Sequence, residues 1–302
     1  MRVLVTGAAG TLGSELAPLL AEAGHDPVLF DIQPIDSPHE TVAGDLRHVQ
    51  DVRGAMQGTD AVVHAAAIHG IHLRNHTPRD FFELNLAGTF NILEAAVEVG
   101  VNALVFSSTM GVYGETGTPT TDDSVVPLHE EQPLRPGDIY GYSKLAGEEL
   151  SRLYVRRHGI RTIALRYRMF VPEPFFHTGI RLLYGGVDSR DVAGAVMAAL
   201  DALIGGSIQW EVFNVESIVP FAENDGPVLR RDPLDALDEH YAGGGSLLRE
   251  RGVPRLAPIV NYYPMGRIAE RLGFHPEHNF EQWLDELRAR PDARAPESGP
   301  WW

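Results

Sequence analysis

The stretch Val3-Leu-Val-Thr-Gly-Ala-Ala-Gly-Thr-Leu-Gly13 decides the fold of this chain. Its first four residues form a short β-branched apolar run, which is typical of a buried parallel strand. Three glycines follow at GxxGxxG spacing, and Ser14 to Ala23 then shows a helical periodicity that Gly24 ends. A strand, a glycine turn and a helix in this order predict a dinucleotide-binding unit.

The three glycines have separate physical roles in such a unit. Gly7 permits the tight turn, Gly10 lets backbone approach a pyrophosphate, and Gly13 allows close packing of helix and strand. The N-terminus of the helix offers free N–H groups and the positive end of its dipole to the phosphates, and Thr11 and Leu12 in the turn are further candidates for cofactor binding. Because the spacing is not GxGxxG, a glycine-rich turn that binds nothing remains the alternative.

Two acidic residues stand where the next strands should end. Asp31 follows the apolar run Pro27 to Phe30, and its carboxylate can accept hydrogen bonds from both ribose hydroxyls of an adenosine. It would repel a 2′-phosphate, which favours NAD over NADP. Asp45, next to Leu46, is a candidate for binding the adenine amino group. Capping the helix expected from Arg47 to Met56 is the equal alternative.

Small residues follow the fourth strand, in the stretch Ala61 to Ala67. Ala65 and Ala66 would let a cofactor lie close against the backbone. His64 sits among apolar residues and is predicted to be a satisfied core histidine. The amphipathic helix expected from Asp80 to Val99 carries Asn85, whose amide could reach the cofactor.

Three histidines, His69, His72 and His76, follow within a short loop. Their density invites a metal site, but no carboxylate or cysteine stands at ligand spacing among them, so no metal is expected. The sequence predicts instead a loop that faces the substrate, with His69 as a candidate substrate contact.

The most chemically suggestive pair is Tyr140 and Lys144, the only lysine among 25 lysine and arginine residues. Positions four apart share one helix face, and a compact ammonium can tune a neighbouring phenol as arginine cannot. The pair therefore predicts an acid–base unit, with an exposed tyrosine and a solvated lysine as the alternative. Ser107, Ser108 and Thr109 follow the strand expected at Leu104 to Phe106, at the sheet edge where ligands bind. Ser107 is a candidate cofactor contact and Ser108 a candidate substrate contact.

Composition excludes several classes of function. The net charge of −16 argues against nucleic acid as a partner, because phosphate binding needs a basic face. No cysteine occurs, which excludes disulfides, Cys-type zinc sites and thiol nucleophiles and fits a reducing compartment. No signal peptide and no apolar run of membrane length is expected, so the predicted location is cytoplasmic, without a membrane partner.

The predicted fold is α/β, a doubly wound parallel sheet of Rossmann type with a small C-terminal substrate-binding lobe. Residues 1–166 are the expected NAD-binding domain, to which 188–215 return with a helix and a strand. Residues 167–187 and 216–290 are the expected lobe, with short helices at 264–272 and 280–290. Residues 291–302 are expected to be a disordered tail.

Four motifs in this order resemble the extended short-chain dehydrogenase/reductases, the NAD-dependent epimerase/dehydratase family. The resemblance covers about residues 1–170, and its motifs are Thr6-Gly-Ala-Ala-Gly-Thr-Leu-Gly13, Asp31, Ser107-Ser-Thr-Met-Gly-Val-Tyr-Gly114, and Glu131-Gln-Pro-Leu-Arg-Pro136 running into Tyr140-Gly-Tyr-Ser-Lys144.

The resemblance implies a role for each matching residue. Tyr140 would exchange a proton with a substrate hydroxyl or ketone, and Thr109 would hydrogen-bond the same oxygen. Lys144 would hold the nicotinamide ribose and lower the pKa of the tyrosine. The glycine turn would hold the pyrophosphate, Asp31 the ribose, and Asp45 with Leu46 the adenine. The family further implies a homodimer through the helices at 80–99 and 140–158.

Departures from the family pattern narrow the reaction. Met110-Gly111 stand where dehydratases of the family carry an acidic pair and decarboxylases a glutamate. Elimination and decarboxylation therefore lose their chemistry, whereas oxidation, reduction and epimerisation need only Tyr140 and Thr109. The resemblance thus implies an NAD-dependent dehydrogenase acting on a small polar, sugar-derived substrate. A sugar epimerase with tightly bound NAD and a non-catalytic NAD-binding sensor are the alternatives.

The substrate lobe is shorter than in nucleotide-sugar epimerases. Only about 20 residues separate Arg166 from Val187, and this short lobe, with Pro172-Glu-Pro174, resembles that of uronate dehydrogenases. Arg166 or Arg168 could pair with a substrate carboxylate or phosphate. A structural ion pair is the alternative for Arg166.

Overall fold

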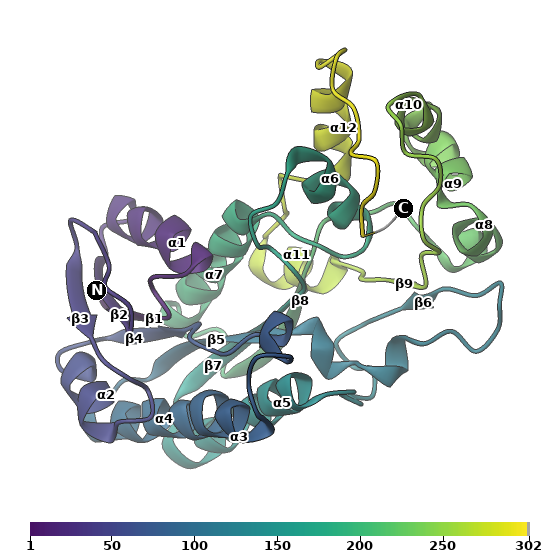
Figure 1. Cartoon of the computed structure of the whole chain (residues 1–302). Helices are drawn as coiled ribbons and strands as arrows, with labels where there is room; N and C mark the ends of the chain where they lie inside the picture. The colour runs from purple at the N-terminus through teal and green to yellow at the C-terminus, as the bar shows by residue number, and fades with distance from the viewer. Residues whose placement is uncertain (301–302) are drawn as a thin grey trace.

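The computed structural model describes residues 1–300, and its centre is a seven-stranded parallel sheet (Figure 1). The strand order is β3-β2-β1-β4-β5-β7-β8. The strands are β1 (Arg2–Thr6), β2 (Asp26–Asp31), β3 (Glu40–Ala43), β4 (Ala61–His64), β5 (Ala103–Thr109), β7 (Arg161–Tyr167) and β8 (Trp210–Val215). The chain moves outward in both directions from β1 and β4, which places a ligand crevice at the carboxyl ends of these two strands.

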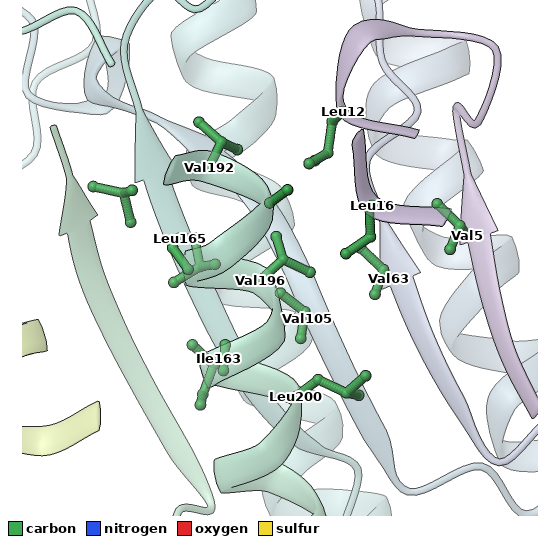
Figure 2. Packing of buried hydrophobic residues seen from close by; sticks show 14 of the residues in the cluster. Val5, Leu12, Leu16, Val63, Val105, Ile163, Leu165, Val192, Val196 and Leu200 are labelled. Atoms are coloured by element: carbon green, nitrogen blue, oxygen red, sulfur yellow. The ribbon is translucent and has the colours of Figure 1, made fainter. Parts of the chain in front are cut away.

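Helices cover both faces of the sheet, as predicted for a doubly wound fold. On one face lie α1 (Thr11–Glu22) and α7 (Ser189–Ile204); the other carries α2 (Val49–Met56), α4 (Gly88–Val99) and α5 (Ile139–His158). Figure 2 shows Leu16 of α1 and Val196 of α7 beside the strand residues Val63 and Val105. Strands buried on both faces must be apolar throughout, which is why they form continuous hydrophobic runs in the sequence.

Two elements differ from their expected bounds. Strand β5 continues to Thr109, so Ser107 to Thr109 are its last residues rather than the loop after it. The helix expected from Asp80 begins as α3 (Pro78–Phe81), which Thr77 caps, and then widens into a π-helical segment, Phe82–Ala87. Because a π-turn holds an extra residue, it changes the direction of the side chains within it.

The C-terminal lobe has a hydrophobic core of its own, visible in Figure 1 as helices gathered near the C-terminus. Its helices are α6 (Phe175–Leu183), α8 (Gly226–Arg231), α9 (Pro233–His240), α10 (Gly244–Glu250) and α12 (Phe280–Arg288). A short parallel pair, β6 (Val126–Pro127) with β9 (Asn261–Tyr262), connects the lobe to the long loop before α5.

Two expectations about the C-terminal part need correction. Met265 and Ile268 belong to the main core, so α11 (Gly266–Leu272) packs with the sheet rather than with the lobe. The tail expected to be disordered from Pro291 packs on the lobe in its first part, since the Ala295 N–H donates to the Arg251 carbonyl at 2.8 Å. Residues 301–302 of that tail lie outside the described part. Within residues 1–300, no helix has both the length and the apolar character to cross a membrane.

Candidate active site

The glycine turn between β1 and α1 leaves no room for side chains at two of its positions. Gly7 has φ +72°, and a Cβ there would lie 2.7 Å from the backbone of Ala66. A Cβ at Gly13 would lie 2.3 Å from the Ala8 carbonyl oxygen. Gly10 precedes α1, whose first turn contains no acidic residue, so its free N–H groups suit an anion.

A cleft of about 420 Å³ runs along the carboxyl ends of the central strands. Its walls include Gly7, Gly10, Phe30, Asp31, Asp45, Leu46, Ala65, Ala66 and His69. The Asp31 carboxylate accepts hydrogen bonds from the N–H groups of Ala9, at 3.0 Å, and Gln33, at 2.9 Å. These bonds hold the carboxylate in place at the end of β2, and the mainly apolar walls with a few fixed polar groups suit a nucleoside.

Asp45 lines this cleft but is paired within the protein. Its carboxylate accepts two hydrogen bonds at 3.0 Å from the Arg47 Nε and one at 2.9 Å from the Arg47 N–H. The hydrogen bond with Arg47 holds the pKa of Asp45 below its ordinary value. The helix-cap alternative is wrong, because α2 begins at Val49 and His48 occupies the cap position.

Helix α5 brings Tyr140 and Lys144 to the carboxyl end of β5. Asp138 caps the helix by accepting the Gly141 N–H at 2.8 Å. Lys144 is 3% exposed, and its Nζ donates to the Ser107 carbonyl at 2.7 Å. Burial lowers the pKa of Lys144 to about 7, although the charge of Glu148 acts to raise it. Lys144 is therefore not solvated, and at neutral pH both its charged and its neutral form are populated.

The Tyr140 phenol lies near the hydroxyl of Thr109, which acts on its pKa. Burial raises the pKa of Tyr140 to about 12, the hydrogen bond with Thr109 lowers it, and the charge of Asp138 raises it. The lowering that the sequence predicted from Lys144 is wrong for this structure. Burial outweighs the other influences, and the ammonium binds a carbonyl of β5.

The His69 loop meets Tyr140 at the edge of the cleft. The ring centroids of His69 and Tyr140 are 6.1 Å apart, and a Cβ on Gly70 would lie 3.0 Å from the Tyr140 Cδ1. Solvent reaches His69 through the cleft, yet the surrounding protein lowers its pKa to about 4, mainly by burial. His69 is therefore neutral at pH 7 and able to donate or accept a hydrogen bond. Among residues 1–300, no group of three potential ligands is arranged to hold a metal ion.

Asn85 does not face the cofactor cleft, which corrects the sequence prediction. Its buried amide accepts the Ile68 N–H at 2.8 Å and donates to the Ile68 carbonyl and the Ser143 Oγ, both at 3.0 Å. The π-helical segment turns Asn85 toward these partners. Asn85 thus joins the loop after β4 to α5 and positions both. His64 is a core histidine as predicted, between the Thr6 and Thr89 hydroxyls.

Arg166 and Ser108 belong to a buried network rather than to the cleft, so their candidate substrate roles are corrected. The Glu148 carboxylate pairs with the Nε and Nη2 of Arg166 at 2.9 and 2.7 Å and accepts the Ser108 hydroxyl. The Arg166 Nη1 also donates to the Tyr113 hydroxyl at 2.9 Å. Glu148 was not among the predicted site residues, although it follows Lys144 by four residues on the same helix face.

Arg168, the remaining arginine candidate, is exposed at the end of β7 and donates from Nη1 to the Tyr263 hydroxyl at 3.1 Å. It is the candidate substrate arginine that the structure leaves accessible.

Comparison with known proteins agrees with this geometry. The chain is 30% identical over 277 residues to a UDP-glucose 4-epimerase of Azospirillum brasilense, spanning 85% of this chain and 74% of the relative. It is 33% identical over 180 residues to a uronate dehydrogenase of Pseudomonas putida, spanning 57% of this chain and 62% of the relative.

A solved short-chain dehydrogenase/reductase superfamily protein of Agrobacterium tumefaciens, with bound NAD, has the same fold. It matches with a TM-score of 0.72 and 25% identity, over 96% of this chain and 97% of that one. A model of the NAD dependent epimerase/dehydratase family matches residues 3–173, which include the glycine turn, Asp31, Thr109, Tyr140 and Lys144. The chain therefore belongs to the NAD dependent epimerase/dehydratase family, among the extended short-chain dehydrogenase/reductases.

Proposed function

We propose that the protein is an NAD-dependent oxidoreductase that moves a hydride between the nicotinamide and a secondary alcohol or ketone of a small, sugar-derived substrate. The observation that carries this proposal is that the Thr109 hydroxyl lies near enough to the Tyr140 phenol to lower its pKa, beside a buried Lys144. Two hydroxyls fixed on one substrate oxygen orient it, and one of them can exchange its proton.

The cleft residues fit the cofactor. The glycine turn and the start of α1 would hold the pyrophosphate, Asp31 the adenosine ribose, and Lys144 the nicotinamide ribose. Asp45, Leu46, Ala65 and Ala66 would surround the adenine side. When bound, NAD supplies the site that accepts or returns the hydride.

The residues of this chain then handle the proton. During oxidation Tyr140, in its phenolate form, accepts the proton of the substrate hydroxyl and becomes a phenol; during reduction the phenol donates this proton to the ketone oxygen and becomes phenolate. Thr109 hydrogen-bonds the same oxygen in both directions. Because the pKa of Lys144 is near neutrality, its amine can gain or lose a proton at little cost in free energy. This supports the change between phenol and phenolate at Tyr140.

A sugar epimerase with tightly held NAD is the second candidate, and the span of the match to the Azospirillum epimerase favours it. The short segment between β7 and α7 favours the dehydrogenase, because it leaves little chain to grip a nucleotide diphosphate. A non-catalytic NAD-binding sensor would not need the catalytic set.

The test is a screen of free sugars, uronates and nucleotide sugars for NADH formation by the purified protein. Protein that is isolated without NAD and reduces added NAD in the presence of a sugar supports the dehydrogenase. Retained NAD with interconversion of sugar epimers supports the epimerase. No turnover of any sugar with bound NAD supports the sensor and contradicts the main proposal.

We further propose that different parts of the chain bind NAD and the substrate, that two copies form a homodimer, and that the protein is cytoplasmic. Residues 1–166 with 188–215 would bind NAD, and 167–187 with 216–290, apart from α11, would bind the substrate.

Exposed apolar residues on the helices of one face, among them Phe82, Phe90, Val97 and Leu153, support pairing of two copies there. The absence of cysteine supports the location. Light scattering after gel filtration tests the dimer.

A further inference from the structure

Arg168 lies at the end of β7, next to the strand that carries Thr109. Tyr167 pairs in register with Thr109 on the neighbouring strand, and Arg168 is the next residue after Tyr167. Neighbouring strands lie about 4.8 Å apart, so the Arg168 side chain starts within the length of one sugar from Thr109. Its guanidinium contacts the hydroxyl of Tyr263, which packs with Met110 in the hydrophobic cluster after Thr109.

Beside this pair lies a buried carboxyl group without a hydrogen-bond partner. Glu216 follows the last residue of β8, is 0% exposed, and neither of its carboxyl oxygens has a partner within residues 1–300. Gly185 closes the site from the other side, because a Cβ there would lie 2.5 Å from the Tyr263 ring and 3.3 Å from the Glu216 Oε2. Buried polar groups are normally hydrogen-bonded, so this arrangement calls for an explanation.

Two arginines, Arg168 and Arg181, act on Glu216. Burial raises the pKa of Glu216 well above its ordinary value, although the charges of both arginines and the backbone N–H of Arg168 act to lower it. Arg181 already has a carboxylate partner in Glu173, at 2.6 Å. Among the described residues no carboxylate lies within 4 Å of the Arg168 guanidinium. In the described part of the chain, Arg168 therefore has no ion-pair partner within 4 Å, and it lies at the end of the strand that pairs with the Thr109 strand.

We propose that Arg168, held in place by Tyr263, anchors a carboxylate or phosphate group of the substrate. This inference rests on the proposed oxidoreductase function and specifies which class of sugar derivative the site accepts. A guanidinium has five N–H donors, and one of them is engaged by Tyr263. The others can bind a carboxylate or phosphate at two points, which also fixes the distance of the anion from the reacting carbon.

The test compares a hexuronate, a hexose 6-phosphate and the neutral hexose of the same configuration as substrates for NADH formation. In Arg168→Met, kcat/KM for the anionic substrate is expected to fall roughly 10- to 100-fold, mainly through KM, since hydrogen bonds to charged groups have this strength. The value for the neutral hexose is expected to stay near wild type. Arg168→Lys should recover part of the loss, and Arg152→Met on the exposed face of α5 is the matched control. The anion whose use is lost identifies carboxylate or phosphate.

A binding measurement keeps the inference separate from the proposed function. Calorimetric titration of each anionic sugar into NAD-loaded Tyr140→Phe protein is compared with the same titration of Tyr140→Phe/Arg168→Met. Loss of binding in the double variant supports the anchor even if wild type turns over no substrate in the panel. Equal binding by both proteins, no binding of either anion, or equal loss of activity on anionic and neutral substrates would overturn it.

Discussion

The Glu148 carboxylate and the Arg166 guanidinium form a two-point ion pair in the interior, with both side chains 2% exposed. The pair joins α5 to β7 behind the active site. Since Tyr140 and Lys144 precede Glu148 on the same face of α5, the ion pair fixes the position of both relative to the sheet. It is thus a positioning contact for the acid–base unit.

Glu148→Gln should destabilise the fold, because it leaves the Arg166 charge buried without its counter-charge. The expected loss in free energy of unfolding is about 3–5 kcal/mol. Urea denaturation followed by circular dichroism measures it. Glu149→Gln is the control, since the neighbouring Glu149 side chain is 61% exposed and its loss should change stability little. Equal free energies of unfolding for the two variants would show that the buried ion pair contributes no more to stability than an exposed carboxylate.

Tyr140→Phe should reduce kcat by at least 10²- to 10⁴-fold, the usual contribution of a positioned acid–base group. NAD binding, measured by fluorescence titration, should remain close to wild type because the proposed role of the phenol oxygen is to contact the substrate. Tyr142→Phe provides a matched control on the same helix, where the side chain is 57% exposed. A fully active Tyr140→Phe protein would refute the assignment.

Asp31→Ala should relax the preference for NAD over NADP, because it removes the carboxylate that repels a 2′-phosphate. The measurement is the ratio of kcat/KM for the two cofactors with one substrate. Asp36→Ala, an exposed acidic residue in the following loop, should leave that ratio unchanged. An unaltered ratio in Asp31→Ala would show that the specificity lies elsewhere.

The central sheet and the glycine turn were predictable because both depend on local sequence. Strands buried on two faces need apolar runs, and the turn needs glycine where Gly7 lies against Ala66. The direction of Asn85 was not predictable, because the π-helical segment shifts backbone hydrogen bonds without changing the hydrophobic periodicity. Helices α8, α9 and α10 were not predicted, because they are short and are stabilised mainly by the shared lobe core.

The pKa values of the acid–base unit could also not be predicted from the sequence. The spacing of Tyr140 and Lys144 predicted their common face correctly, but not how much protein surrounds them. Burial is a property of the whole fold, and here it moves the two groups in opposite directions, to about 12 for Tyr140 and about 7 for Lys144.

The lowered pKa of Lys144 predicts a specific pH dependence of stability. Below pH 7 the side chain is protonated in both the folded and the unfolded chain, so it does not make stability depend on pH there. Between about pH 7 and its ordinary value of 10.5, the folded protein holds fewer protons there than the unfolded chain. Its contribution to stability therefore rises with pH across this window and is lost as pH falls through 7.

Comparison of wild type with Lys144→Met isolates this contribution from other titrating groups. The difference between their free energies of unfolding, measured in urea from pH 6.5 to 9.5, should shift in favour of wild type by up to about 1.4 kcal/mol per pH unit. Parallel pH profiles for the two proteins would mean that Lys144 has an ordinary pKa in the folded state.

Gly70 offers a test of how closely the His69 loop controls Tyr140. A methyl group on Gly70 would lie 3.0 Å from the Cδ1 and 3.4 Å from the Cε1 of Tyr140, so Gly70→Ala must push either the loop or the ring away. A displaced phenol misaligns proton transfer, and kcat should fall roughly 10-fold while the affinity for NAD changes little.

Gly54→Ala in α2 is the matched substitution, because a methyl there meets no atom within 4 Å. It should keep full activity and gain about 0.5–1 kcal/mol in stability, as alanine does in a helix interior. If Gly70→Ala is as active as Gly54→Ala, the loop yields without moving the phenol, and the position of Tyr140 depends on α5 and Thr109 alone.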